Sequence, residues 1–144
     1  MEELFELRTH IEQGNYSEAL ILIGEMEEMS KDDKINKIFS YIEILLIHLI
    51  KQNAEKRSAR SWEASIRNSV YRINYINKRR KAGGYYCTAD ELKETIDDAW
   101  PTSLLKASFE AFEGRYDDDE LAQKIDEKQI KREGLKLILD TLRP

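Results

Sequence analysis

Residues 31–52, KDDKINKIFSYIEILLIHLIKQ, form the longest apolar-rich stretch of the chain and decide its fold. Apolar side chains recur in this stretch at spacings of three and four, as they do on one face of an α-helix. They form a broad stripe: Ile35, Ile38, Phe39, Ile42, Leu45, Leu46, Leu49 and Ile50. Ile44 and Ile47 add apolar surface on a second side, and a helix that is apolar on more than one side is usually surrounded by neighbours. We therefore predict a central helix over residues 31–52, with Ser30 as its N-cap.

Two amphipathic segments, residues 2–13 and 16–29, come before the predicted central helix. Gly14 and Asn15 separate them, and both residue types readily adopt the left-handed conformation that ends a helix. Because the link between the two segments is so short, the sequence predicts a helical hairpin.

Amphipathic patterns resume after a polar connector at residues 53–60 and predict further helices. These helices cover residues 61–81, 88–100, 102–114, 117–125 and 127–142. Thr88 and Glu91 have the spacing of a capping box, which starts the second of these helices. Pro101 lacks an amide hydrogen and is expected to interrupt that helix, with a new one beginning directly after it.

The length and composition of the chain fit one helical domain. Its 144 residues match the usual size of a single domain, and it combines 41% hydrophobic and 35% charged residues with only two prolines. We therefore predict an all-α fold, an irregular bundle of six to eight helices around the central helix, in a single domain of residues 1–144.

Three features bear on the cellular location. The single cysteine, Cys87, excludes an internal disulfide and fits a reducing compartment. The N-terminal segment is acidic and amphipathic, unlike a signal peptide. The apolar run at residues 42–50 is shorter than the about 20 residues that a membrane-spanning helix needs. We expect a cytoplasmic protein that does not cross a membrane.

Charge is distributed unevenly along the chain. Residues 51–82 carry ten basic and two acidic side chains, a net charge of +8. Residues 1–50 and 83–144 carry net charges of −7 and −6, so the whole chain has a net charge of −5. A basic middle is therefore flanked by acidic ends, and such segments could also pair between two copies of the chain.

Two motifs on neighbouring predicted helices carry a family resemblance. The central helix ends with His48, Leu49 and Lys51, and a second motif follows: Arg57, Ser58, Ser61, Trp62, Ile66 and Arg67. This pattern resembles the domain of unknown function family 29, small helical proteins found largely in cyanobacteria. The resemblance covers about residues 16–114 and leaves residues 115–144 as a helical C-terminal extension. Because the family has no known function, the resemblance implies a helical bacterial protein and no particular activity.

The chain departs from the family pattern at two places. Gln52-Asn53-Ala54 stand where the family usually has a tryptophan followed by Gln-Pro. Gly83-Gly84-Tyr85-Tyr86 stand where the family often has a Pro-Ser-Leu turn.

His48 is the residue that most resembles a catalytic group. A general base needs a polar cleft and a partner within hydrogen-bond reach. Glu43 falls on another face of the helix, and no nearby histidine or cysteine completes a metal site. We therefore expect a packed histidine bonded to a carbonyl or a carboxylate, and we predict no catalytic residue, no metal site and no cofactor. The sequence favours a non-catalytic protein over an enzyme.

Arg57, Arg60, Trp62 and Arg67 form the first candidate interaction site. Guanidinium groups bind carboxylates and phosphates through two parallel hydrogen bonds, so these arginines could hold an anion or an acidic partner. They could equally pair with acids of an earlier helix and fix the packing of the two helices. The acids in question are Glu25, Glu27 and Glu28. The number of acids on that helix favours the internal pairing, and both interpretations stay open.

The second candidate site is the basic end of the same predicted helix: Lys78, Arg79 and Arg80. Tyr71 and Tyr75 lie among the cations, and such a mixture suits single-stranded nucleic acid. The sequence pI of 5.2 argues against a nucleic-acid-binding domain, which is usually strongly basic. We therefore predict a protein-interaction or regulatory module that binds another protein or a second copy of itself. The alternative is a nucleic-acid-associated protein that uses the basic face of residues 56–81.

Overall fold

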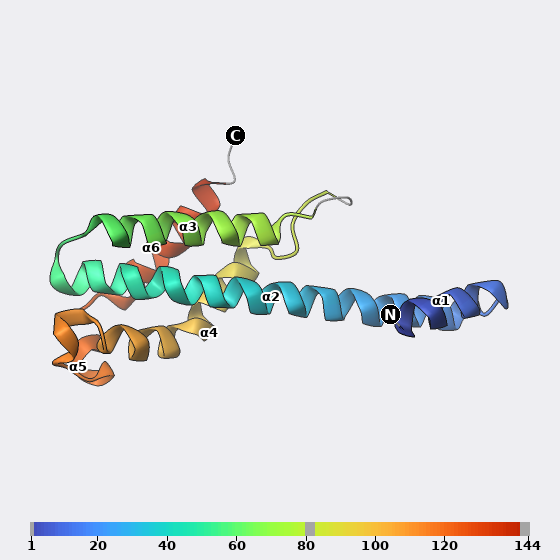
Figure 1. Ribbon diagram of the computed structural model, residues 1–144, viewed down its shortest axis with the longest axis horizontal. Helices are drawn as coiled ribbons and strands as arrows, with labels where there is room; N and C mark the ends of the chain where they lie inside the picture. Colours follow the sequence, from blue (N-terminus) through green and yellow to red (C-terminus); the bar gives the residue numbers. More distant parts are fainter. Residues whose placement is uncertain (1, 80–82, 142–144) are drawn as a thin grey trace. The chain divides into compact units, whose positions relative to one another are not determined.

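The computed structural model describes residues 2–79 and 83–141 of the chain. These residues form helices and a single isolated β-bridge, which confirms the predicted all-α fold. In chain order the elements are α1 (Glu2–Glu12), α2 (Tyr16–Glu55), α3 (Arg60–Asn77), α4 (Ala89–Ser108), the 3-10 helix η1 (Ala111–Gly114), α5 (Asp118–Ala122) and α6 (Glu127–Asp140) (Figure 1). The chain divides into two compact units, Met1–Lys34 and Ile35–Pro144, and their boundary lies inside α2. Among these described helices, none is both long enough and apolar enough to cross a membrane.

The first unit consists of α1 and the first part of α2, which form the predicted helical hairpin. Gly14 joins them with a φ of 76°, the left-handed conformation that commonly ends a helix. Its amide donates to the carbonyl oxygen of Ile11 over 3.1 Å. Glu3 of α1 lines a shallow cavity together with Met26 and Met29 of α2, so the two helices lie side by side.

α2 continues without a break through Ser30, so the helix boundary predicted there is wrong. A serine inside a helix costs only about 0.5 kcal/mol relative to alanine, which is too little to end it. No proline or glycine follows Ser30 before α2 ends. The predicted second helix and the predicted central helix are therefore one continuous helix.

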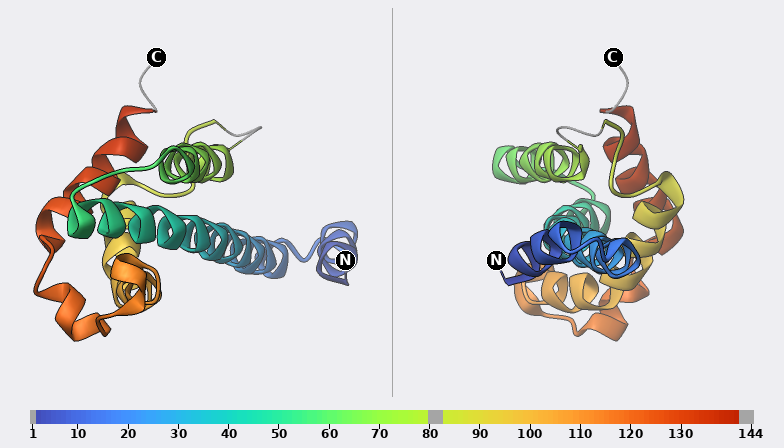
Figure 2. Two further views of the ribbon diagram at one scale, coloured as in Figure 1. Left: turned by 60° about the vertical axis from the view of Figure 1, so that its left-hand side comes forward. Right: turned by 90° about the vertical axis from the view of Figure 1, so that its right-hand side faces the viewer.

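The second unit is built around residues 35–55 of α2. α3, α4 and α6 lie around this part of the helix (Figure 1, Figure 2). Ile73 of α3, Ile96 of α4 and Ile138 of α6 are almost completely buried in the same core. The α2 side chains that are almost completely buried are Ile38, Ile42, Leu45, Leu46, Leu49 and Ile50. The prediction of a central helix with apolar neighbours on more than one side is confirmed for this part of α2.

α4 runs through Pro101, so the interruption predicted there is also wrong. A proline inside a helix removes one hydrogen bond and clashes with the preceding turn, at a cost of about 3 kcal/mol. Pro101 is exposed, whereas Ala99, Trp100 and Ser103 beside it are buried. The Ser103 hydroxyl donates to the carbonyl oxygen of Ala99 over 2.7 Å, so its burial leaves no polar group unpaired. The burial of one continuous helix face outweighs the cost of the proline.

α3 ends at Asn77, earlier than the predicted end at residue 81. Lys78 is extended and forms an antiparallel bridge with Tyr85. The Asn77 side chain is completely buried and bonds the backbone of Cys87 twice. The Cys87 amide donates to Asn77 Oδ1 over 2.8 Å, and Asn77 Nδ2 donates to the Cys87 carbonyl oxygen over 3.3 Å. Asn77 therefore fixes the path by which the chain returns from α3 to α4.

Side-chain caps start three helices of the second unit. The predicted capping box of Thr88 and Glu91 is confirmed at the start of α4. Asp117 and Glu120 form a second capping box at α5, and the carboxylate of Asp126 caps α6. These caps satisfy backbone amides that would otherwise lack partners, so each helix begins at a defined residue.

We predict that Gly134→Ala stabilises the protein. Gly134 is a buried residue inside α6, and an added Cβ would lie 3.5 Å from Leu49 Cδ1 and 3.7 Å from Leu46 Cδ2, an ordinary van der Waals separation. Because glycine inside a helix costs roughly 0.5–1 kcal/mol relative to alanine, the free energy of unfolding should rise by about that amount. Urea denaturation followed by circular dichroism measures the change. A lower free energy of unfolding would show that α6 lies too close to α2 to accommodate the added Cβ.

We predict that Asn77→Ala lowers the free energy of unfolding by roughly 1–3 kcal/mol, because it leaves the buried backbone groups of Cys87 unpaired. Asn68→Ala on the exposed side of the same helix is the matched control and should have little effect. Equal losses in the two variants, measured by urea denaturation, would show that the buried hydrogen bonds of Asn77 contribute nothing.

Candidate functional site

Trp62, near the start of α3, lies against two cations. α2 ends where Lys56 adopts a positive φ of 53°, and the chain then turns so that Arg57 lies over the indole. The guanidinium carbon of Arg57 is 4.5 Å from the ring centroid, and Lys51 Nζ is 4.6 Å from it. Cations at these distances are attracted to the electron-rich face of the ring. Lys51 and Trp62 are both buried, so the contact joins the end of α2 to α3.

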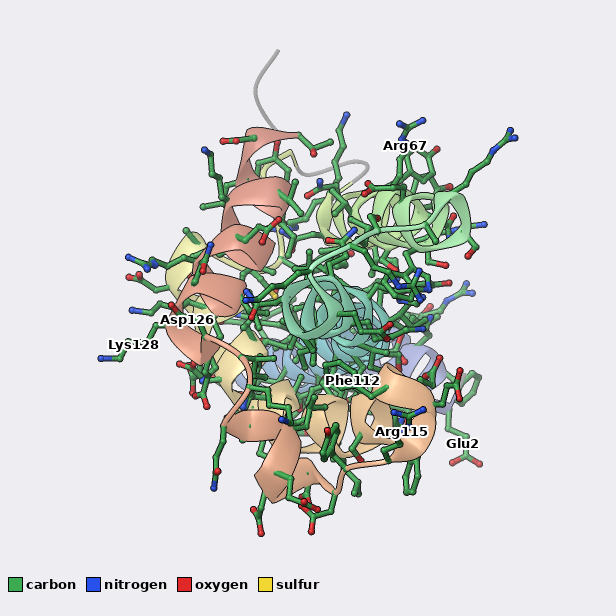
Figure 3. All side chains as sticks on the ribbon, turned by 90° about the vertical axis from the view of Figure 1, so that its left-hand side faces the viewer. Glu2, Arg67, Phe112, Arg115, Asp126 and Lys128 are labelled. Atoms are coloured by element: carbon green, nitrogen blue, oxygen red, sulfur yellow. The ribbon has the colours of Figure 1, made fainter. Side chains whose placement is uncertain are left out.

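Two carboxylates balance these cations and connect the turn to the segment after α4. Lys51 Nζ donates to Glu110 Oε1 and Arg57 Nε donates to Glu55 Oε1, each over 3.1 Å. The other oxygen of Glu55, Oε2, accepts a hydrogen bond from the Phe112 amide over 3.2 Å. Phe112, labelled in Figure 3, has a φ of 53°, a conformation that costs a residue other than glycine about 1–3 kcal/mol and needs such support.

We call Lys51, Glu55, Arg57, Trp62 and Glu110 the Trp62 cluster. Its members come from α2, the turn after it, α3 and the segment after α4. Each cation contacts both the Trp62 ring and a carboxylate. The cluster therefore holds these chain segments together.

Gln52 and Asn53, which depart from the family pattern, both have structural partners. Gln52 Nε2 donates to Ser58 Oγ over 2.8 Å and to Glu63 Oε1 over 3.0 Å. The Ser58 hydroxyl donates to the same oxygen of Glu63 over 2.7 Å. The side-chain oxygen of Asn53 accepts the amide of Asp126 over 3.2 Å and so positions the start of α6. The departures therefore serve the local packing of this chain.

The structure separates the first candidate interaction site into two parts. Arg57 and Trp62 meet in the Trp62 cluster, whereas Arg60 and Arg67 lie on the exposed side of α3. Arg67 points away from the helix into solvent (Figure 3). Within the second unit Arg57 pairs with Glu55. The predicted pairing of these arginines with acids of the first unit stays a prediction.

The exposed side of α3 combines cations with aromatic rings. We call this side, together with the residue that follows the helix, the outer face of α3: Arg60, Arg67, Tyr71, Tyr75 and Lys78. Tyr71 and Tyr75 are 57% and 49% exposed. Their rings stack with centroids 6.2 Å apart and an angle of 22° between the planes. The sequence of α3 contains one acid, Glu63, and its carboxylate is bonded to Gln52 and Ser58.

The remaining predicted cations lie at the end of α3 and beyond it. Lys78 ends the outer face, and Arg79 is exposed with its guanidinium carbon 5.8 Å from the ring centroid of Tyr86. Arg79 therefore belongs to the connection between α3 and α4. Arg80 lies outside the described residues.

His48 has a partner on its own helix. Its Nδ1 lies 2.9 Å from the carbonyl oxygen of Ile44, one turn earlier, which is the contact expected of a packed histidine. Across residues 2–79 and 83–141, no group of three His, Cys, Asp or Glu side chains is arranged to hold a metal ion. Cys87 is a buried free thiol.

Residues 9–117, from α1 to the N-cap of α5, match the family described as Domain of unknown function DUF29. The chain belongs to this family. No curated protein and no solved structure matches it. The resemblance predicted from the motifs is confirmed. The DUF29 match contains the whole Trp62 cluster and the outer face of α3, and α6 lies beyond its end.

The geometry divides the motif residues of this DUF29 protein by role. Lys51, Arg57 and Trp62 form the centre of the Trp62 cluster, and Ile66 is buried in the core. Arg67 differs from them, because within the described part of the chain it has no hydrogen bond or ion pair. Packing therefore accounts for most of the motif and leaves Arg67 available for a contact with another molecule.

Sequence reasoning missed a polar contact between α2 and α4. Lys106 Nζ donates to Glu43 Oε1 over 2.8 Å, and Thr102 Oγ1 donates to Glu43 Oε2 over 2.5 Å. Partial burial alone would raise the pKa of Glu43, but the hydrogen bonds from Lys106 and Thr102 and the charge of Lys106 lower this pKa below the ordinary glutamate value. No local spacing predicts a contact between residues so far apart in sequence.

We predict that Glu43→Gln lowers the free energy of unfolding at about pH 7 by about 1 kcal/mol, because Lys106 is half exposed and the pair is partly screened. A lowered folded pKa means that the Glu43 contribution is complete above the ordinary glutamate pKa and is lost as the pH falls through the lowered value. The difference between variant and wild type should therefore shrink at about pH 3. Urea denaturation at both pH values tests this, and a difference that does not change with pH would contradict it.

Proposed function

We propose that this DUF29 protein is a non-catalytic protein-interaction module whose outer face of α3 binds an acidic surface of a partner protein. The observation that carries the proposal is the composition of this face, which presents three cations and two stacked, exposed tyrosines. Tyrosine and arginine are enriched among the residues that contribute most of the binding energy at protein interfaces. A face that combines both therefore suits a partner carrying carboxylates beside apolar groups.

The internal contacts of α3 support this assignment. Its inner side is occupied by packing, with Trp62, Ile66 and Ile73 in buried positions. Its one acid, Glu63, is bonded to neighbouring side chains. The outer face therefore carries positive charge that no carboxylate of α3 offsets, on a helix held rigidly from the other side.

The charge of the whole chain favours an acidic protein over nucleic acid as the partner. The net charge is −5, so long-range forces repel a polyphosphate chain, and the cations act only at short range within the outer face. Residues 2–34 contain ten acidic and three basic side chains, so a second copy of this chain is one source of an acidic surface. In keeping with the family resemblance, the proposal places this module in the bacterial cytoplasm.

A nucleic-acid-associated function on the basic face of residues 56–81 is the second candidate. The stacked pair of Tyr71 and Tyr75 favours it, because exposed aromatic rings beside cations are the platforms on which single-stranded bases stack. Binding of that kind weakens steeply with salt as counterions are released, which distinguishes it from a protein interface that includes apolar contacts.

We predict that the wild-type protein binds a fluorescein-labelled peptide rich in glutamate and leucine more tightly than it binds labelled oligothymidylate. Arg60→Glu combined with Arg67→Glu should weaken peptide binding at least tenfold, because it reverses the charge at two of the three cationic positions of the outer face. Fluorescence anisotropy at several salt concentrations measures both affinities.

The matched control reverses two exposed cations elsewhere in the second unit, Arg115→Glu with Lys136→Glu, and should leave peptide affinity unchanged. Equal effects of the two double variants would contradict the proposal. Tighter binding of oligothymidylate, lost in the Arg60/Arg67 variant, would establish the nucleic-acid alternative instead. Sedimentation velocity on the same two variants shows whether the acidic partner is a second copy.

A further inference from the structure

A groove between α4 and α6 lies apart from the outer face of α3. Its volume is about 460 Å³, within the range of about 300–1,000 Å³ that is common for small-molecule sites. α4 contributes Lys93, Ile96 and Asp97, spaced so that they share one side of the helix. From α6 come Glu127, Lys128, Lys131, Arg132 and Leu135.

The two carboxylates of the groove both bind the same cation, Lys131. Lys131 Nζ lies 3.1 Å from Asp97 Oδ1 and 2.8 Å from Glu127 Oε2, and it is 5.3 Å from the centroid of the Trp100 ring. Burial would lower the pKa of Lys131, but the hydrogen bonds that it donates to Glu127 and Asp97 raise this pKa above its ordinary value. Lys131 therefore stays charged at neutral pH and keeps both carboxylates engaged.

Three cations of the groove remain without a carboxylate. Lys93, Lys128 and Arg132 are exposed, and none has a hydrogen bond or ion pair with any residue of the described ranges. Lys128 extends from α6 into solvent at the edge of the groove (Figure 3). With four cations and two carboxylates, the lining has a formal charge of +2 on a protein whose net charge is negative.

The base of the groove is apolar. Ile96 belongs to the buried core, and the half-buried Leu135 packs against that core from α6. A ligand that fits must therefore combine a negative head group, which the cations of the rim attract, with an apolar part that covers the accessible side of Leu135. Arg132 suits the head group, because a guanidinium fork binds a carboxylate or a phosphate through two hydrogen bonds.

We propose that this groove binds a small amphipathic anion, a carboxylate or phosphate joined to a short apolar chain. Lys128 and Arg132 hold the head group, and the chain lies over Leu135. Because α6 lies outside the DUF29 match, the C-terminal extension supplies one wall of this site and α4 supplies the other, and the site is separate from the outer face of α3.

We predict that octanoate and octyl phosphate bind in the groove. A titration followed by two-dimensional amide NMR of the uniformly nitrogen-15-labelled full chain should shift the signals of Ile96, Lys131 and Leu135. Octanol, which lacks the charge, and inorganic phosphate, which lacks the chain, should each bind at least tenfold more weakly than octyl phosphate.

Lys128→Ala combined with Arg132→Ala should weaken octanoate binding at least tenfold, since both side chains are exposed and their loss leaves the core intact. Arg115→Ala with Lys136→Ala is the matched control and should leave the affinity unchanged. Shifts confined to residues outside the groove, or equal affinities for octanol and octanoate, would overturn the proposal. The Arg60→Glu/Arg67→Glu variant should bind octanoate with wild-type affinity. The test of the groove is therefore independent of the test of the outer face of α3.

Discussion

The structure depends on the burial of one stretch of α2, which has apolar neighbours on more than one side. From Ile38 to Ile50, six large side chains of this stretch are almost completely removed from water. Each contributes about 1.5–3 kcal/mol, so together they outweigh the local preferences of any helix that packs against them. The buried side chains of this stretch pack against one face each of α3, α4 and α6. Their opposite faces can then carry charges and tyrosines with little effect on stability.

The Trp62 cluster fixes the orientation of α3 relative to the buried part of α2. Lys51 at the end of α2 contacts Trp62 and Glu110, and Arg57 in the turn contacts Trp62 and Glu55. Three chain segments are thereby tied together at the point where α3 begins. A binding surface that is already ordered loses less conformational freedom when a partner binds. The Trp62 cluster therefore favours the outer face of α3 as an interaction surface.

Local patterns in the sequence were enough to predict the all-α fold, the buried stripe of α2 and the capping box at Thr88. They failed at Ser30, where the small cost of a serine does not end the helix, and at Pro101, where burial of the neighbouring residues outweighs the cost of a proline. Contacts such as Glu55 with Phe112 join residues distant in sequence, so no spacing rule reveals them. The candidate arginines were found by residue type, but only the structure separates Arg57, which is held in the Trp62 cluster, from the exposed cations of α3.

Hydrogen exchange of backbone amides tests most directly whether burial of α2 governs the fold. Amides from Ile42 to Leu49 should exchange only when the whole protein unfolds, with an exchange free energy equal to that from urea denaturation. Amides from Tyr16 to Met29 in the same helix should exchange much faster, because exposed side chains such as Leu20 dominate there. Uniform protection along the whole of α2 would contradict this account.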